Sequence, residues 1–367
     1  MSKLRLTALA ALGILGLLSM RGFAEPYSHS GKQVNSLSEV SILGRITSDG
    51  DDPTVTLYIW ENQGLLIRMH SIWSTGEGGR SWKLMGQVSQ HRGPSSFEAV
   101  WPRNKTDIFA LAGGSVFEST NQGRDWKRKG AIPGSIGSFR AMAGDDEEKW
   151  LVSAGQRSVP TSQKNLSSLP KYANDVASTS QAPRMFIPAI SIAEDDGQIW
   201  QSAPLPKEIG ALDRVVVSGS FAIAIGPYTV LTTTNKGRSW LAPKEIGVGD
   251  EEEAYPLSAA IFGKRLWVSL KNGTLLTGDI SKQELAVVSK SAVPLEDLRF
   301  TDSCRGFALR ENNLATTADG GITWREVTHS KDVLAMSVSR SGIFAATHDQ
   351  VLRINPQHGQ PGTACVN

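Results

Sequence analysis

The sequence has almost no surplus of charge of either sign. Its 38 lysine and arginine residues face 36 aspartate and glutamate residues over 367 positions. Removal of residues 1–24, which carry three of the basic residues, would leave 35 basic and 36 acidic residues. Because a protein that binds nucleic acid normally carries a strong basic surplus, this balance argues against a nucleic-acid partner.

Cysteine is nearly absent, since Cys304 and Cys365 are the only two. This excludes a framework of several disulfides and leaves room for one bridge. In an exported protein the two can pair, which would close a 61-residue interval and stabilise the fold by roughly 2–4 kcal/mol. The alternative is one buried thiol and one loose thiol in the C-terminal tail.

Clusters of metal-binding residues are also missing. The six histidines are scattered and lack the spacing of a zinc site. The acidic run Asp250–Glu253 is typical of a solvated loop. We therefore expect neither a metal nor a cofactor.

Only one long apolar run occurs, from Leu6 to Met20, preceded by Lys3 and Arg5. Small residues around Ala24 follow it, as at a secretory cleavage site, and the run is short for a membrane-spanning helix. We expect a signal peptide over residues 1–24, an exported location in the periplasm or outside the cell, and no membrane span after cleavage. An uncleaved membrane anchor is the alternative.

What the sequence does have is one eight-residue motif written five times, Ser/Thr-x-Asp/Asn-x-Gly-x-x-Trp. It occurs at Ser119–Trp126, Thr233–Trp240 and Thr317–Trp324, with a Glu variant at Thr75–Trp82 and an Ala variant at Ala193–Trp200. The residues expected to have a structural role in these motifs are Glu77, Trp82, Asn121, Gly123, Trp126, Asp195, Gly197, Trp200, Asn235, Gly237, Trp240, Asp319, Gly321 and Trp324.

Each motif position suits a tight hairpin between two strands. The acid or amide side chain is expected to accept backbone N–H groups one or two residues further on, with help from the hydroxyl. Glycine supplies a positive φ. The tryptophan then begins the next strand and packs a large ring against the neighbouring sheet.

The spacing of the motifs indicates what carries them. The first positions lie 44, 74, 40 and 84 residues apart. A decayed copy that begins Thr277, Gly278, Asp279 divides the last gap into 44 and 40, and a Ser/Pro-rich insertion at about residues 155–188 explains the gap of 74. A period of 40 to 44 residues with strand-like content is typical of β-propeller blades.

The last repeat has only three predicted strands, Val333–Val338, Gly342–Thr347 and Gln350–Ile354. A propeller does not leave such an edge open, and the alternating segment Glu39–Ile46 can fill it. The sequence thus predicts an all-β, seven-bladed propeller of four-stranded antiparallel blades, closed by an N-terminal strand. We expect one domain over residues 38–355, a flexible segment before it at 25–37 and a tail at 356–367; six or eight blades are the alternatives.

The repeated turn resembles the Asp-box, or BNR repeat, and the resemblance is strongest to the photosystem II assembly and stability factor family. It rests on Gly113–Trp126 and Gly226–Trp240 and covers about residues 40–355. The resemblance implies a non-enzymatic exported protein that helps to assemble or stabilise a membrane complex. Glu77 in the first motif and the decayed copy that begins at Thr277 depart from the family pattern.

Sialidases and other glycoside hydrolases share the Asp-box, so a hydrolase acting on extracellular glycans is the alternative function. Sialidases usually carry a Phe/Tyr-Arg-Ile-Pro motif. The nearest string in this sequence, Phe186–Pro188, lacks the arginine. None of the five tyrosines has an obvious glutamate partner. A pair of catalytic carboxylates from different blades stays open, because sequence spacing does not exclude it.

A partner surface is expected on the face opposite the repeated turns, where the insertion interrupts the repeat. Loops that bind partners are often carried on a rigid scaffold in this way; a disordered, solvent-exposed insert is the alternative. We expect a monomer that binds a membrane-associated protein. The candidate contact residues are His91, Arg92, Arg157, Lys164, Lys171, Tyr172 and Arg184.

Overall fold

The structure is a computed structural model. All of the residues that it describes belong to the compact unit Ser38–Asn367. The expected signal peptide, the segment 25–37 and the tail 356–367 lie outside the described residues. The structure describes residues 40–45, 55–60, 62–68, 71–87, 97–104, 106–133, 137–160, 184–207, 209–242, 254–282, 284–327, 332–339 and 342–354.

The described residues form β-strands that run antiparallel to their neighbours. In chain order the strands are β1 (Val40–Arg45), β2 (Val55–Trp60), β3 (Gln63–Arg68), β4 (Ser71–Thr75), β5 (Lys83–Gln87), β6 (Ala99–Pro102), β7 (Ile108–Ala112), β8 (Ser115–Ser119), β9 (Lys127–Ala131), β10 (Gly137–Asp145), β11 (Trp150–Pro160), β12 (Arg184–Ala193), β13 (Gln201–Ser202), β14 (Arg214–Ser218), β15 (Phe221–Gly226), β16 (Thr229–Thr233), β17 (Pro256–Phe262), β18 (Arg265–Leu270), β19 (Thr274–Asp279), β20 (Ala286–Lys290), β21 (Glu296–Phe300), β22 (Gly306–Arg310), β23 (Asn313–Thr317), β24 (Arg325–Glu326), β25 (Ala335–Ser339), β26 (Gly342–Ala346) and β27 (Gln350–Ile354).

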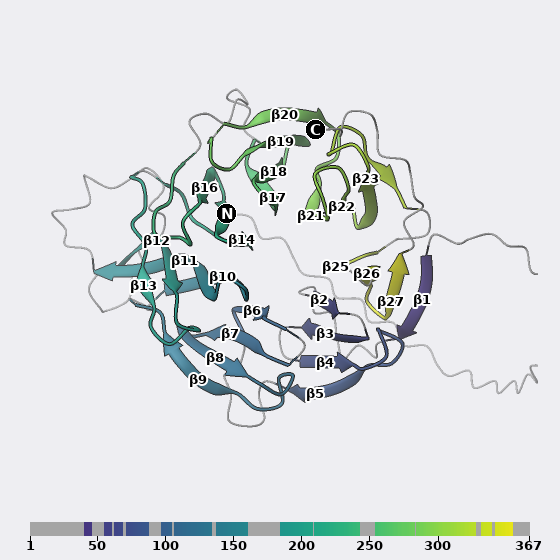
Figure 1. The fold of residues 1–367 in the computed structure, drawn as a ribbon, viewed down its shortest axis with the longest axis horizontal. Coiled ribbons are helices and arrows are strands. Elements are labelled where there is room, and N and C mark those ends of the chain that lie inside the picture. Colours follow the sequence, from purple (N-terminus) through teal and green to yellow (C-terminus); the bar gives the residue numbers. More distant parts are fainter. Residues whose placement is uncertain are drawn as a thin grey trace, which may run out of the picture. The chain divides into compact units, whose positions relative to one another are not determined.

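These strands form seven sheets arranged around a common centre (Figure 1). Blades 1, 2, 3, 5 and 6 each take four consecutive strands, beginning with β2, β6, β10, β17 and β21. The predicted all-β, seven-bladed propeller is therefore confirmed. The third strands of blades 1, 4 and 6 are β4, β16 and β23, and each ends at the first residue of a repeated motif, Thr75, Thr233 or Thr317.

Blade 4 departs from the expected four strands. Its sheet contains β14, β15 and β16, and a single bridge between Thr232 and Leu241 stands where a fourth strand would pair. Pro243 follows two residues later in the sequence and has no N–H to donate to a strand ladder. The pairing therefore ends after one residue among those that the structure describes.

The ring is closed by the N-terminal strand, as predicted. Strand β1 pairs with β27 from Val40–Ile354 to Arg45–Gln350, with one bulge between Ile42 and Gly44. It thereby completes blade 7, whose order is β1-β27-β26-β25, and Figure 1 shows β1 on the outer side of β27. The pairing covers an edge that would otherwise present a row of free backbone groups.

The motif tryptophans fill the spaces between blades. Trp126 of blade 2 packs against the cluster of Leu65 and Ile72 from blade 1, and Trp82 of blade 1 packs against the cluster of Phe344 and Val351 from blade 7. Trp200, Trp240 and Trp324 likewise join clusters with blades 2, 3 and 5. Each tryptophan therefore buries apolar surface between its own blade and the preceding one, and burial of this kind stabilises folded proteins.

The two faces of the ring carry different loops. The turns between third and fourth strands lie beside those between first and second strands, since Gln122 N–H donates to the Thr106 carbonyl and Lys236 N–H to the Ser220 carbonyl. We call this side the box face, and the other side the opposite face. Within the described ranges, no helix is long and apolar enough to cross a membrane.

Candidate functional site

The repeated motifs, called here boxes 1, 2, 3, 4 and 6 after their blades, bond mainly within themselves. In box 2 the Ser119 hydroxyl oxygen accepts the N–H groups of Asn121 and Gly123, at 3.4 and 2.8 Å, and donates to Asn121 Oδ1. Asn121 Oδ1 accepts the N–H of Asp125 at 2.9 Å. Boxes 4 and 6 repeat the pattern with Thr233 and Thr317.

This geometry differs from the expected role of the acid. The acid or amide accepts an N–H four residues further on, while the hydroxyl takes the nearer groups two and four residues on. The hydroxyl sits at the end of a strand and reaches the first turn of the loop, so it occupies the near donors. The longer acid side chain spans the loop and fixes its far side.

The glycine and the tryptophan are joined directly. The Trp126 indole donates to the Gly123 carbonyl at 3.1 Å, and boxes 1, 3 and 6 contain the same bond. In box 4 the buried Trp240 Nε1 has no hydrogen-bond partner among the residues that the structure describes. A Cβ on Gly237, which has φ of 76°, would lie 2.7 Å from Ile192 Cγ2 in blade 3, so the position requires glycine for space as well as for backbone conformation.

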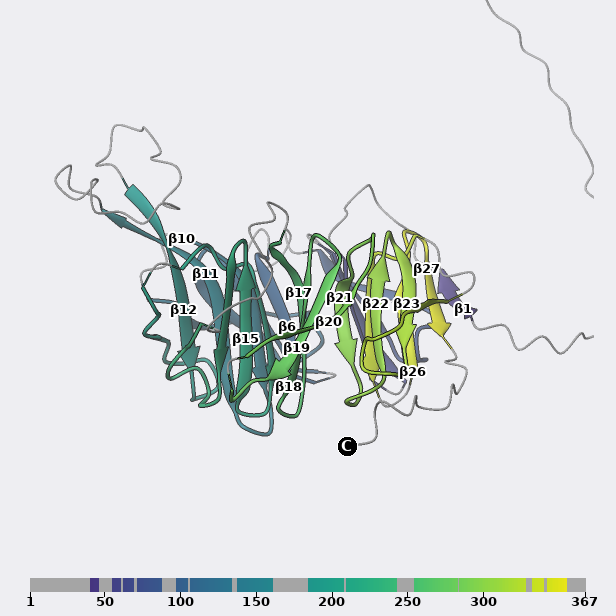
Figure 2. The same ribbon diagram turned by 90° about the horizontal axis from the view of Figure 1, so that it is seen from above.

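On the opposite face, two strands of blade 3 extend beyond the ring as a ribbon (Figure 2). The ribbon consists of Gly155–Pro160 of β11 paired with Arg184–Ala189 of β12, and at its base Gly155–Arg157 also pair with β10. We expected an insertion over about residues 155–188, but both of its ends are paired strand. The β-branched and aromatic residues Val159, Phe186 and Ile187 favour strand structure here, so the paired strands extend into both ends of the expected insertion.

The candidate partner residues are only partly described. Arg157 lies in β11 between Gly137 of β10 and Ile187 of β12, and its buried Nε has no hydrogen-bond partner within the described part of the chain. The backbone of Arg184 pairs with Pro160. His91, Arg92, Lys164, Lys171 and Tyr172 lie outside the described residues, so their placement on one surface stays a prediction.

The Cys304–Cys365 bridge also stays a prediction. Cys304 is buried in the turn between β21 and β22, and its carbonyl accepts the N–H of Gly320 in box 6. Cys365 lies outside the described residues.

A pair of tyrosines on the opposite face was missed from the sequence. Tyr228 is 64 % exposed and has φ of 61° in the hairpin between β15 and β16. Its ring lies 6.1 Å from that of Tyr255, and the Lys271 ammonium lies 5.0 Å from the Tyr255 ring centre. The sequence contained a signal for this residue: after Pro227 a turn of this kind favours glycine, and a tyrosine stands there instead.

Burial shifts the pKa of several titratable groups on, or directly before, the first strands of the blades. Burial raises the pKa of Tyr58 to about 12, which makes its phenol a poor nucleophile at neutral pH. Burial also raises the pKa of the Glu98 and Asp213 carboxyls, which belong to blades 2 and 4. Among the described residues, no group of three or more His, Cys, Asp or Glu could hold a metal ion.

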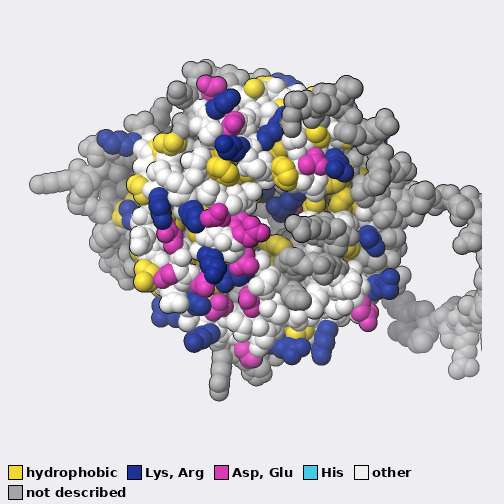
Figure 3. Space-filling view, in the orientation of Figure 1, with side chains coloured by type: hydrophobic (Ala, Val, Ile, Leu, Met, Phe, Trp, Pro, Cys, Tyr) yellow, Lys and Arg dark blue, Asp and Glu magenta, His cyan; other side chains and the backbone are white. Residues whose placement is uncertain are grey.

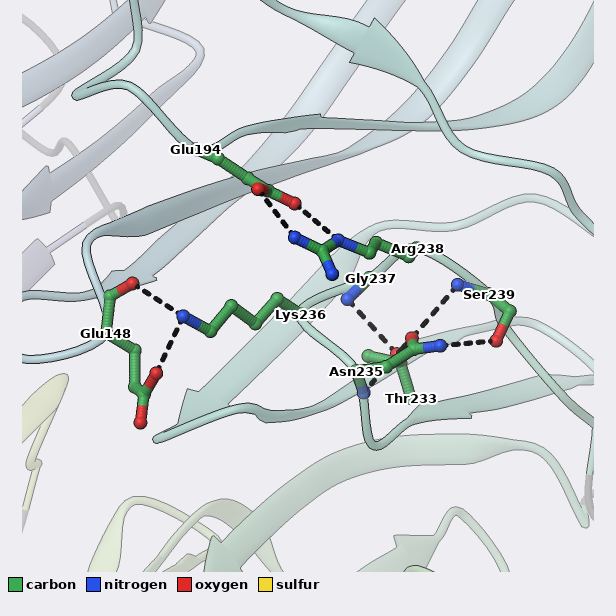
Figure 4. A network of polar contacts seen from close by, with 8 residues as sticks. All are labelled: Glu148, Glu194, Thr233, Asn235, Lys236, Gly237, Arg238 and Ser239. Atoms are coloured by element: carbon green, nitrogen blue, oxygen red, sulfur yellow. Dashed lines mark hydrogen bonds and ion pairs between the residues drawn. The ribbon is translucent and has the colours of Figure 1, made fainter.

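On the box face, blade 3 is held by ion pairs from both neighbours. Arg103 of blade 2 contacts Asp146 at 3.3 Å and Asp196 at 2.7 Å. From blade 4, Lys236 contacts Glu148 at 2.7 Å and Arg238 contacts Glu194 at 2.7 Å. Figure 4 shows both blade 4 side chains reaching away from box 4 toward their carboxylates.

The seam between blades 3 and 4 contains a cavity of about 380 Å³. On this face Figure 3 shows acidic and basic side chains interleaved beside the central opening. The bidentate hydrogen bond from Arg238 holds the pKa of Glu194 below its usual range. The residues that line the cavity are Ile192, Glu194, Asp195, Ile199, Gln201 and Arg238.

Comparison with known proteins identifies the fold and no family. No protein-family model and no curated protein sequence matches the chain. A solved structure titled YCF48 bound to D1 peptide is 15 % identical, with a TM-score of 0.57 over 86 % of this chain and 94 % of that one. YCF48 from Cyanidioschyzon merolae is also 15 % identical, with a TM-score of 0.58 over 86 % of this chain and 99 % of that one.

A third structure shows how widely this architecture occurs. The WD40 repeats of RRP9 are 9 % identical, with a TM-score of 0.58 over 87 % of this chain and 97 % of that one. At such identities the similarity shows a shared seven-bladed fold. Function must be argued from sites, because one propeller fold carries many activities.

Proposed function

We propose that this protein is an exported, non-enzymatic propeller scaffold that binds a protein partner and assists a membrane or envelope complex. The observation that supports this most is the ribbon of β11 and β12, which extends beyond the ring on the opposite face and flanks the predicted insertion in the sequence. A paired ribbon positions a recognition loop at little entropic cost, since its base is already ordered.

The blade that carries the ribbon is itself well anchored. Ion pairs from Arg103 on one side and from Lys236 and Arg238 on the other join its box-face loops to both neighbouring blades. Trp150 of β11 also donates to the Gly219 carbonyl of blade 4 at 2.8 Å. Such a blade suits a binding element, because loops on rigid scaffolds keep their geometry.

Two further features support the proposal. The leader-like segment Leu6–Met20 supports export. Among the similar propellers, YCF48 has been solved with a D1 peptide bound, which makes peptide binding a reasonable task for this architecture.

The test is cross-linking and affinity capture in the native host. A variant lacking Leu166–Gln181 should keep its thermal stability, because the ribbon pairs up to Pro160–Arg184 remain, and should lose a membrane-associated partner. The matched control is Ile322→Ser, which alters a 49 % exposed side chain on the box face and should leave capture unchanged. Equal capture by the deletion variant would contradict the proposal, as would glycoside turnover by the purified protein that one carboxylate substitution abolishes.

A further inference from the structure

The cavity between blades 3 and 4 has a mixed lining. Ile192, 7 % exposed, forms its apolar floor, and Ile199, 64 % exposed, stands at its side. Glu194, Asp195, Gln201 and Arg238 supply the polar groups. The cavity lies on the box face, separate from the ribbon of the opposite face.

Box 3 differs from the other boxes at two positions, and one of them, Ile199, lines this cavity. In boxes 1, 2, 4 and 6 the seventh residue is polar, and its side chain bonds the acid or amide of the third position, as Ser81 does to Glu77 and Thr323 to Asp319. In box 3 the seventh residue is Ile199. The first residue, a hydroxyl donor in boxes 2, 4 and 6, is Ala193 in box 3.

Because of these two changes, the Asp195 carboxylate lacks the side-chain hydrogen bonds that the other boxes form at this position. Its Oδ1 and Oδ2 both accept the same N–H, that of Ile199, at 2.9 and 3.2 Å. Among the described side chains, no cation pairs with Asp195, while its neighbour Asp196 is paired with Arg103. A carboxylate can accept about four hydrogen bonds, so Asp195 retains acceptor capacity toward the cavity.

The lining also has an uncompensated negative charge. It contains two carboxylates and one guanidinium, and the guanidinium of Arg238 is already engaged by Glu194 through two bonds of 2.7 and 2.9 Å. The exposed Ile199 adds apolar surface where the other boxes place a polar group. A ligand that suits this cavity therefore combines a positive head with an aliphatic stem.

We propose that this cavity binds the arginine or lysine side chain of a polypeptide. The aliphatic stem of such a side chain packs over Ile192 and Ile199, since long basic side chains bury their stems on apolar surface and keep their heads polar. The charged head donates to Asp195, with Gln201 beside it. This binding is independent of the partner proposed for the opposite face.

The test uses the full propeller with indole-¹⁵N-labelled tryptophan. Nα-acetyl-arginine amide is titrated against the neutral Nα-acetyl-citrulline amide, and the Trp200 indole is followed, because it bonds Gly197 inside box 3. We expect the Trp200 signal to shift with the arginine amide and at least threefold tighter binding of it than of the citrulline amide.

Two substitutions in box 3 keep the turn chemistry of other boxes. Asp195→Asn introduces the residue found at this position in boxes 2 and 4, and Ile199→Ser introduces the residue found in boxes 1 and 4. Each should weaken binding of the arginine amide at least threefold. Asp319→Asn makes the same change in box 6 and should leave binding unchanged.

Any of three results would overturn the proposal. These are equal binding of the arginine and citrulline amides, unchanged binding in both box 3 variants, or an equal loss of binding in Asp319→Asn. Loss of ribbon-dependent partner capture would not affect these measurements, so the two proposals fail separately.

Discussion

Arg238 of blade 4 donates two hydrogen bonds to Glu194 of blade 3, from Nε to Oε1 at 2.7 Å and from an Nη to Oε2 at 2.9 Å. The pair joins box 4 to the end of β12 (Figure 4). The pair thus links two blades through side chains that lie 44 residues apart in the sequence.

The Glu194–Arg238 pair should make stability depend on acidity. Because the Arg238 hydrogen bonds lower the pKa of Glu194 in the folded state, the pair stabilises the fold above the unfolded-state pKa, about 4.3. That contribution is lost as the pH falls through the folded-state pKa. In Glu194→Gln, the melting temperature should fall by about 1–2 °C at pH 7, as for a mostly exposed pair.

The same variant should differ little from the wild type once both are measured at pH 3 or below, which thermal denaturation followed by circular dichroism can check. Glu147→Gln alters an exposed neighbour that forms no ion pair with any other described residue; it is the control and should change neither value. A loss in Glu194→Gln that persists undiminished at pH 3 would contradict the assignment.

Strand β1 should contribute strongly to ring stability. Removal of residues 1–45 deletes the whole β1–β27 ladder and exposes the edge of β27, so we expect the melting temperature to fall by about 5–10 °C and the protein to associate. Removal of residues 1–37 keeps the ladder and is the control. Calorimetry and light scattering measure the two effects, and equal behaviour of the two truncations would show that β1 does not close the ring.

Gly237 should tolerate no side chain. Gly237→Ala places a Cβ 2.7 Å from Ile192 Cγ2 at φ of 76°, so we expect a loss of about 2–4 kcal/mol in the free energy of unfolding. Gly219→Ala is the matched control, because Gly219 has φ of 59° but open space around its Cβ. It should cost about 1 kcal/mol, and urea unfolding that found equal losses would remove the steric argument.

The two cysteines should form one bridge in the exported protein. Peptide mapping without reductant should recover a fragment that links Cys304 to Cys365, and reduction should lower the free energy of unfolding by roughly 2–4 kcal/mol. Cys365→Ser should abolish both the linked fragment and the effect of reductant. Recovery of both thiols free from oxidised protein would contradict this prediction.

Local signals in the sequence were sufficient for the repeating parts of the fold. The spacing of the boxes gave the blade count, and third strands such as β16 and β23 end at the first residue of a box, Thr233 and Thr317. The missing strand of blade 7 pointed to β1 because an open edge is unfavourable. These features depend on neighbours in the chain or on a repeat that the chain itself displays.

The candidate site depended on contacts that the repeat does not encode. The sequence did not show where the ribbon ends and the insert begins, because Gly155–Pro160 forms a strand only by pairing with residues about thirty positions later. The exposed Tyr228 was missed because the sequence around it indicates a hairpin turn and does not indicate that the tyrosine forms part of a surface.

The sequence by itself determined an all-β ring of seven blades, since each blade repeats the same turn chemistry and cannot bury its faces alone. Only the tertiary structure decided which side chains meet across blades, such as Glu194 with Arg238, and which box acid faces a cavity. The physical reason is that hairpin geometry is set within some forty residues, whereas the seam between two blades is set by how their side chains pack.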